Sequence, residues 1–107
     1  KEETNMLKIQ LLCAAGVSTS LLMAKMKEQA ALNGEEIEIS ACPVTEIEEY
    51  IANADVALIA PQVAYLKAKS RKIADTHGVP VEVISMKDYA HCNGAAVLDL
   101  AHSLTGK

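Results

Sequence analysis

The sequence of 107 residues contains no Trp, no Phe and only three Tyr, and its net charge is −4. Nucleic-acid binding is disfavoured, because stacking on bases needs aromatic rings and contact with a phosphate backbone needs positive charge. Cysteines are also scarce: Cys13, Cys42 and Cys92 are odd in number and widely spaced. Such spacing fits neither a disulfide framework nor a zinc site built from close pairs, so we predict reduced thiols, no metal and no cofactor.

Long apolar runs are missing as well. No stretch approaches the roughly 18 residues of a membrane span, and no basic leader precedes an apolar segment, so we expect a cytoplasmic protein without membrane insertion. Residues 1–5 are polar and precede Met6. We predict that residues 1–5 are a disordered tail or a cloning remnant. Residues 6–107 are then a single domain, since 50% hydrophobic content at this length can close one core.

Strand and helix patterns alternate along the chain. Apolar runs and one alternating stretch predict four strands, over residues 7–13, 35–40, 55–60 and 79–85. Helical spacing of apolar residues follows each strand: between Ser18 and Gly34, from a capping box at Thr45–Glu48, over residues 63–77, and after Asn93-Gly94. Four such alternations predict a three-layer α/β domain with a parallel sheet and helices on both faces.

The polarity of the strands predicts their order. The stretch 35–40 is the most polar and 55–60 is nearly all apolar, which favours an edge place for the second strand and the order 2-1-3-4. Ligands bind such sheets where the order reverses, at the carboxyl ends of strands one and three. Cys13 and Pro61-Gln62 emerge there. Cys42 is expected to end the second strand at the edge, away from this point.

The segment CAAGVSTS, residues 13–20, is rich in small residues. Small residues let successive backbone N–H groups point at an anion, and the following helix adds the positive end of its dipole. Both features favour a thiolate at Cys13 or a bound phosphoryl group. The alternative remains that Cys13 is a small buried filler and Ser18 an ordinary helix cap.

Related phosphate-binding motifs fit this segment poorly. It lacks the terminal Gly-Lys-[Ser/Thr] of the nucleotide-binding P-loop and two glycines of the dinucleotide fingerprint. A thiol phosphatase would place an arginine where Thr19 stands, and threonine has no charged fork to clamp phosphate. The pattern therefore favours a cysteine that accepts a phosphoryl group and keeps it until a second acceptor arrives.

Together with this loop, APQVAYL (60–66) and PVEVIS (80–85), followed by Tyr89 and Asn93-Gly94, resemble the enzyme IIB component of the lactose/cellobiose (chitobiose) branch of the bacterial sugar phosphotransferase system. The resemblance spans nearly the whole chain from Met6. It implies a fold like that of low-molecular-weight tyrosine phosphatases. The implied function is a phosphocysteine carrier, a component of a protein-phosphocysteine–sugar phosphotransferase.

The resemblance also implies partners. Phosphohistidine on enzyme IIA is the donor, and the acceptor is a sugar imported by membrane-embedded enzyme IIC, a β-linked disaccharide such as cellobiose, chitobiose or lactose. The carrier is expected to be a monomer when free and to reach the inner face of the membrane through enzyme IIC.

The implied site residues follow from the matching motifs. Cys13 is the phosphorylated nucleophile, and the contacts beside it, to the site or to partners, are Pro61, Gln62, Tyr65 and Tyr89. The phosphoryl-binding loop consists of Ala14, Ala15, Gly16, Val17, Ser18, Thr19 and Ser20. Val17 and Leu21 are further candidates for partner contact. The chain departs from its relatives after Tyr89, where they usually carry glycine; we interpret His91, like His77 and His102, as an ordinary solvated or helix-end histidine.

Two other functions stay open. A thiol-dependent phosphatase or arsenate-reductase-like enzyme would turn over p-nitrophenyl phosphate through Cys13. A passive binding or regulatory module would bind its partner equally well with Cys13 alkylated and would never become phosphorylated.

Overall fold

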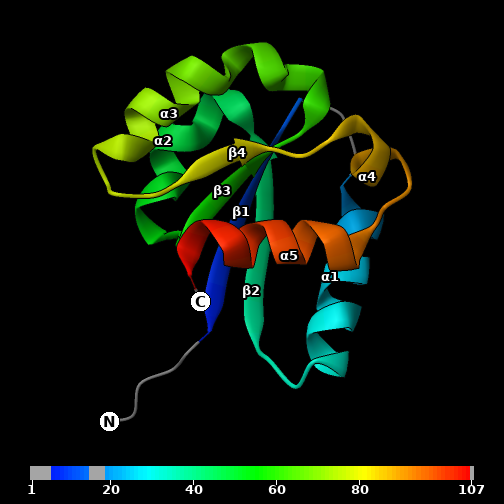
Figure 1. Ribbon diagram of the computed structural model, residues 1–107. Helices are drawn as coiled ribbons and strands as arrows, with labels where there is room; N and C mark the ends of the chain where they lie inside the picture. The colour runs from blue at the N-terminus through cyan, green and yellow to red at the C-terminus, as the bar shows by residue number, and fades with distance from the viewer. Residues whose placement is uncertain (1–5, 15–18, 107) are drawn as a thin grey trace, which may run out of the picture.

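The computed structural model describes residues 6–14 and 19–106 (Figure 1). Four parallel strands form one sheet in the order β2-β1-β3-β4. The strands are β1 (Leu7–Cys13), β2 (Ile37–Pro43), β3 (Val56–Ile59) and β4 (Val81–Val83). The predicted class, parallel pairing and strand order are thus confirmed, with the polar strand β2 at one edge.

Helices cover both faces of this sheet (Figure 1). The helices α1 (Ser20–Leu32) and α5 (Gly94–Thr105) pack on one face, which we call the α1/α5 face. The other, the α2/α3 face, carries α2 (Ile47–Tyr50) and α3 (Lys67–Asp75). A short helix, α4 (Met86–Ala90), follows β4 at the carboxyl edge of the sheet.

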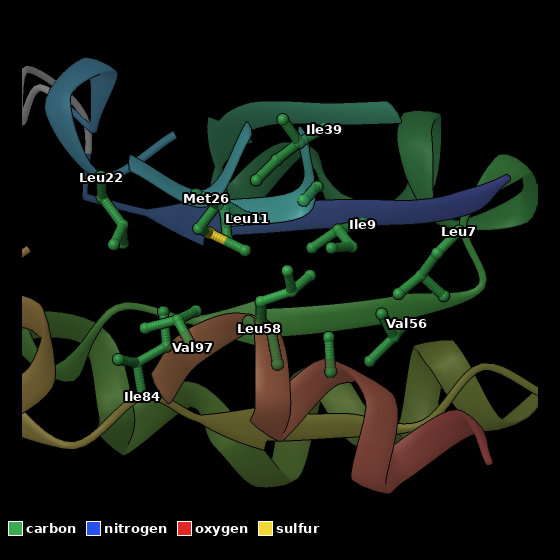
Figure 2. Packing of buried hydrophobic residues seen from close by; sticks show 13 residues of the cluster. Leu7, Ile9, Leu11, Leu22, Met26, Ile39, Val56, Leu58, Ile84 and Val97 are labelled. Carbon is green, nitrogen blue, oxygen red and sulfur yellow. The ribbon is translucent and has the colours of Figure 1, made fainter. Parts of the chain in front are cut away.

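The α1/α5 face has a core of large aliphatic side chains (Figure 2). Alternate residues of β1 point toward this face because successive side chains of a strand face opposite sides. Leu11 and its neighbour Leu58 on β3 meet Met26 of α1, and these side chains are at most 2% exposed. Burying side chains of this size contributes about 1.5–3 kcal/mol each, so this face is a main source of stability.

The α2/α3 face also has a core of mostly aliphatic side chains, but alanines and two thiols are mixed among them. Leu12 and Ile59 are fully buried there, beside Ala57. Two thiols, Cys13 and Cys42, belong to the same cluster. Thiols and alanines fill less space than leucines, so the volume of this face depends on the short segments that close over it.

Those short segments correct several predictions. The capping box at Thr45–Glu48 is wrong: no side-chain cap hydrogen bond forms at either helical start there, and 3₁₀ turns (Val44–Glu46 and Ile51–Asn53) flank the single turn of α2. The predicted long helix over 63–77 begins instead as a 3₁₀ segment, Pro61–Leu66, before α3. Proline at the first position of Pro61–Leu66 favours such a local start.

Two further boundaries also differ from the predictions. The fourth strand is only Val81–Val83, because residue Ser85 ends the extended run and caps a helix that the sequence patterns did not indicate. The Ser85 hydroxyl accepts a hydrogen bond from the Asp88 N–H at 3.1 Å. At the other edge, β2 continues to Pro43, three residues beyond the predicted stretch 35–40.

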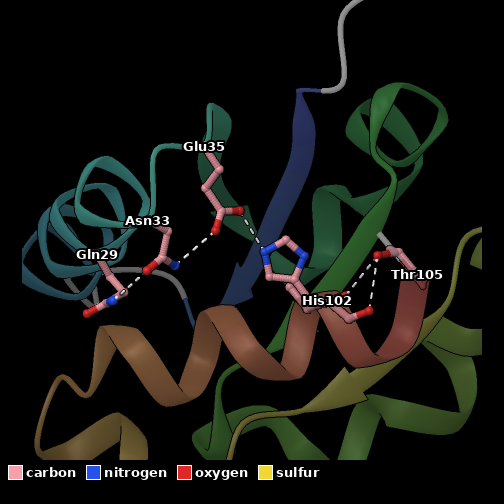
Figure 3. A network of polar contacts seen from close by, with 6 residues as sticks. Gln29, Asn33, Glu35, His102 and Thr105 are labelled. Carbon is pink, nitrogen blue, oxygen red and sulfur yellow. Dashed lines mark hydrogen bonds and ion pairs between the residues drawn. The ribbon is translucent and has the colours of Figure 1, made fainter.

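A polar network ties α5 to the turn between α1 and β2 (Figure 3). The His102 ring nitrogen Nε2 lies 2.7 Å from Glu35 Oε1, and Asn33 donates to the other oxygen of that carboxylate at 3.0 Å. Gln29 of α1 in turn donates to Asn33. His102 therefore has a structural contact at the amino edge of the sheet, which agrees with its interpretation as an ordinary helix histidine.

Candidate functional site

Cys13 is the last residue of β1 and lies at the carboxyl edge of the sheet. Its neighbours there are Pro43, its register partner on β2, and Ala60, whose N–H donates to the Leu12 carbonyl at 2.8 Å. Because β1 pairs with β2 on one side and β3 on the other, Cys13 sits where the strand order reverses. The structure therefore places the predicted nucleophile at the switch point, as the topology required.

A shallow pocket of about 180 Å³ opens over Cys13. Its walls come from the ends of β1 and β2 and from the 3₁₀ segments that follow β2 and β3. The lining residues are Cys13, Ala14, Pro43, Val44, Thr45, Val63, Tyr65 and Leu66. No charged side chain is among them. A reacting group held here would meet an apolar wall and few groups able to activate water.

The thiol itself is largely shielded. Only 6% of the Cys13 residue surface is exposed, and its Sγ donates to the Cys42 carbonyl at 3.5 Å. Burial raises the pKa of the Cys13 thiol, which opposes the thiolate that the following loop was expected to favour. The described surroundings of the sulfur therefore favour the thiol over the thiolate.

Only part of the predicted phosphoryl-binding loop falls in the described chain. Ala15, Gly16, Val17 and Ser18 lie outside the described residues. Ala14 is half-buried beside Cys13, Thr19 is buried at the start of α1, and Ser20 is the first residue of that helix. The first turn of α1 contains no acidic residue, so its positive end is not offset by a carboxylate on the helix itself.

The neighbouring residues that the resemblance implied are only partly brought together. Tyr65 lines the pocket with 79% of its surface exposed. Pro61 and Gln62 follow β3 at the same edge but do not line the pocket. Leu21, at the start of α1, is 59% exposed, as a partner contact requires.

Tyr89 of α4 packs against both core clusters and is half-buried. Its hydroxyl oxygen is buried with no hydrogen-bond partner within residues 6–14 and 19–106. Burial raises the pKa of this phenol, and negative charge on Cys13 or Cys92 raises it further, which places the ring within electrostatic reach of both sulfurs. Tyr89 thus packs against the cluster that contains Cys13, and its raised pKa favours the neutral phenol.

Cys42 requires a correction. We expected it away from the switch point, but its carbonyl accepts from Cys13 and its side chain shares the buried cluster of Cys13. The expectation was wrong because parallel strands β1 and β2 end together, so the edge strand still contributes its last residues to the site. Pro43, Val44 and Thr45 were missed for the same reason. A proline directly after an apolar pair was the available signal for a later strand end.

The remaining candidate groups lie apart from the pocket. His77 and His91 are exposed, at the ends of α3 and α4. Across the described part of the chain, no group of three His, Cys, Asp or Glu side chains is arranged to hold a metal ion. Nor do the described residues include a helix long and apolar enough to cross a membrane.

Comparison with known proteins identifies the family. The family model described as "PTS system, Lactose/Cellobiose specific IIB subunit" matches residues 8–100. The chain belongs to this IIB family. It is 45% identical over 101 residues to the galactose-specific EIIB component of Lactococcus lactis subsp. cremoris, which covers 90% of this chain and 94% of the relative. The oligo-beta-mannoside-specific EIIB component of Bacillus subtilis is 44% identical over 99 residues, 92% of this chain and 96% of that one.

Solved structures show the same IIB fold. The cellobiose-specific IIB component of Borrelia burgdorferi superposes with a TM-score of 0.79 at 33% identity, covering 95% of this chain and 94% of that one. The lactose-specific IIB domain of Streptococcus pneumoniae gives a TM-score of 0.82 at 19% identity, covering 94% and 98% of the two chains, which compares the folds alone. This EIIB component is thus a sugar-specific part of the phosphotransferase system with the phosphatase-like fold of its family.

Proposed function

We propose that this EIIB component is a phosphocysteine carrier, in which Cys13 takes a phosphoryl group from phosphohistidine on EIIA and passes it to a sugar bound by EIIC. The observation that carries the proposal is the place of Cys13. It is a thiol at the carboxyl end of β1, under an open pocket at the switch point of an EIIB fold. The sugar is a β-linked disaccharide such as cellobiose, chitobiose or lactose, a class suggested by the family description and by relatives of cellobiose specificity.

The first transfer, from EIIA to Cys13, balances without any group beyond the two proteins. Sulfur of Cys13 attacks phosphorus, the S–P bond forms as the P–N bond of phosphohistidine breaks, and the thiol proton passes to the leaving imidazole. The raised pKa of Cys13 supports this order, because the sulfur keeps its proton until an imidazole approaches. In the second step a sugar hydroxyl attacks phosphorus, the S–P bond breaks, and the hydroxyl proton ends on sulfur.

Backbone groups are proposed to hold the phosphoryl oxygens during both steps. The segment from Ala14 to Ser20 would supply N–H donors, and the start of α1 would add its partial positive charge. We also assign Tyr89 a supporting place, since its buried hydroxyl has no partner in the described chain and lies near Cys13. Tyr65 and Leu21, both exposed at this edge, are proposed contacts for the docked proteins, as is Val17.

The pocket favours storage of phosphate over its hydrolysis. Among the described residues, its lining has no arginine to clamp phosphate and no carboxylic acid to protonate a leaving group. Three further parts of the proposal are independent of the pocket. The carrier acts in the cytoplasm, it is one domain over residues 6–107, and it is a monomer when free. It would reach the membrane through EIIC.

Mass spectrometry after incubation with phosphorylated EIIA tests the proposal. The protein should gain one phosphoryl group, located on the tryptic peptide that contains Cys13. Cys13→Ser should abolish the gain, whereas Cys92→Ser should keep it, because Cys92 lies in the turn after α4. Uptake by Cys13→Ser equal to that of the unchanged protein would sink the proposal. Turnover of p-nitrophenyl phosphate through Cys13 would favour the phosphatase alternative instead.

A further inference from the structure

A second groove continues from the pocket over Cys13 and runs between α2 and α3. It holds about 220 Å³ and shares Val44, Thr45 and Leu66 with that pocket. Its other lining residues are Ile47, Glu48, Lys69, Ser70 and Ile73. Because the groove adjoins the pocket over Cys13, a protein that docks over Cys13 can also contact the groove.

The size of this groove indicates what it can hold. Pockets for whole small ligands span roughly 300–1,000 Å³, so a volume of about 220 Å³ suits one or two side chains better than a sugar or nucleotide. Its floor is apolar, formed by Ile47 with Leu66 and Ile73. An aliphatic side chain from a partner segment matches both properties.

Charge differs sharply between the two walls. The α2 wall and the turn before it carry three exposed carboxylates, Glu46, Glu48 and Glu49, and none of them forms an ion pair within residues 6–14 and 19–106. Burial raises the pKa of the Cys42 thiol, which lies beside Cys13, and negative charge on Glu46 and Glu49 raises it further. Among the described residues, the exposed cation that lines the groove on the α3 wall is Lys69, and Arg71 and Lys72 are exposed elsewhere on α3. The partner's complementary charge at the α2 wall is therefore positive.

Of the two partners, the membrane component fits this pattern. Cytoplasmic loops of membrane proteins carry an excess of Lys and Arg, so the surface that EIIC presents to a carrier is basic. Resting on the proposed function, we propose that the α2–α3 groove binds a cytoplasmic segment of EIIC that carries an aliphatic side chain next to Lys or Arg. The aliphatic side chain enters the groove, and the basic residue pairs with Glu48.

Phosphorylation strengthens this preference. A phosphoryl group on Cys13 adds roughly 1.5 to 2 negative charges, by analogy with phosphate esters, close to the three carboxylates of α2 and its preceding turn. The phosphorylated carrier then attracts the basic acceptor more than the unphosphorylated carrier does. Loss of the phosphoryl group to the sugar weakens the attraction and favours release.

The test uses the phosphorylated protein and inverted membrane vesicles that contain EIIC and saturating sugar. The KM for the phosphoprotein is taken from initial rates of sugar phosphorylation. Glu48→Lys should raise this KM about fivefold, from reversal of a surface charge pair, and high salt should shrink the difference. Lys69→Glu should lower KM, since it adds negative charge to the same groove.

Glu36→Lys is the matched control. It makes the same charge change at an exposed position just before the amino end of β2, whereas α2 follows the carboxyl end of that strand. The Glu36→Lys substitution should leave KM unchanged. Equal KM values for Glu48→Lys and Glu36→Lys would overturn the inference. So would a Glu48→Lys protein whose phosphoryl uptake from EIIA slows by the same factor, because α2 would then contact the donor. If the unchanged protein takes up no phosphate, the proposed function itself fails, and this result is distinct from the other two.

Discussion

The two faces of the sheet differ in what covers them. On the α1/α5 face, two helices of 13 and 12 residues enclose a core of leucine, isoleucine, valine and methionine. On the α2/α3 face, the nine-residue α3, the single turn of α2 and 3₁₀ segments cover a core that mixes aliphatic side chains with alanines and two thiols. Both pockets near Cys13 open on this second face.

This difference gives the two faces different roles: the α1/α5 face mainly stabilises the domain, and the α2/α3 face gives partners access to the site. Long helices bury continuous apolar stripes and stabilise the domain, whereas short turns leave grooves between them that a partner can enter. The side chains of β3 show the division at neighbouring positions, since Leu58 faces the first core and Ile59 the second. Substitutions at such pairs test the two faces against each other.

The largest expected effect on folding stability comes from truncating the side chains of Leu58 and Ile59. Both side chains are fully buried, so Leu58→Ala should cost about 3–5 kcal/mol of unfolding free energy and Ile59→Ala about 2–3 kcal/mol, because the short segments over Ile59 can settle into the cavity. Urea denaturation measures both values. Ile59→Ala should also slow phosphoryl uptake at Cys13, its cluster neighbour, while Leu58→Ala should not. Equal effects on uptake would contradict the division between the faces.

A smaller loss is expected where α5 approaches α1. A Cβ added at Gly94 would lie 2.5 Å from the carbonyl carbon of Lys25 and 2.7 Å from the backbone nitrogen of Met26. Backbone atoms cannot turn aside as a side chain can, so Gly94→Ala should shift the two helices and cost about 2 kcal/mol. Thermal or urea denaturation measures the loss. Ala95→Ser, at the exposed neighbour, is the control and should stay within about 0.5 kcal/mol of the unchanged protein.

The smallest effect is alkaline sensitivity of the α2/α3 face. Burial raises the pKa of Cys42 to about 11, helped by Cys13 and the carboxylates Glu46 and Glu49. In the unfolded chain the thiol ionises near its ordinary pKa of about 8.5. Between about 8.5 and about 11 the unfolded chain thus loses the proton first, and folding stability falls as pH rises, by about 1–2 kcal/mol at about pH 10.

Denaturation curves from neutral to alkaline pH check this expectation. Cys42→Ala should make the profile shallower without flattening it, because alanine has no proton to lose but burial also raises the pKa values of Cys13 and Tyr89. Cys92→Ala, which removes the half-buried thiol, should keep the slope of the unchanged protein. A profile that is the same for all three proteins would show that Cys42 does not titrate during unfolding.

Much of the fold could be predicted from local patterns. The apolar run ending at Cys13 and the polar strand around Ile39 were enough to infer a parallel sheet with β2 at its edge. Boundaries were predicted less well where competing local preferences were close in energy. The spacing at Thr45–Glu48 resembles a capping box, yet Pro43 and the packing of Val44 and Ile47 lead to 3₁₀ turns without side-chain caps.

For the site, the apolar pattern was enough to predict a cysteine at the carboxyl end of a central strand, at the switch point, because strand order depends on which segments are apolar enough to be buried on both sides. The packing of distant segments was needed to show that Cys42 and Pro43 lie beside Cys13, and that burial raises the pKa of the Cys13 thiol. The physical reason is the separation along the sequence over which each effect acts. Apolar periodicity is local, whereas desolvation and the meeting of strand ends depend on residues about 30 positions apart.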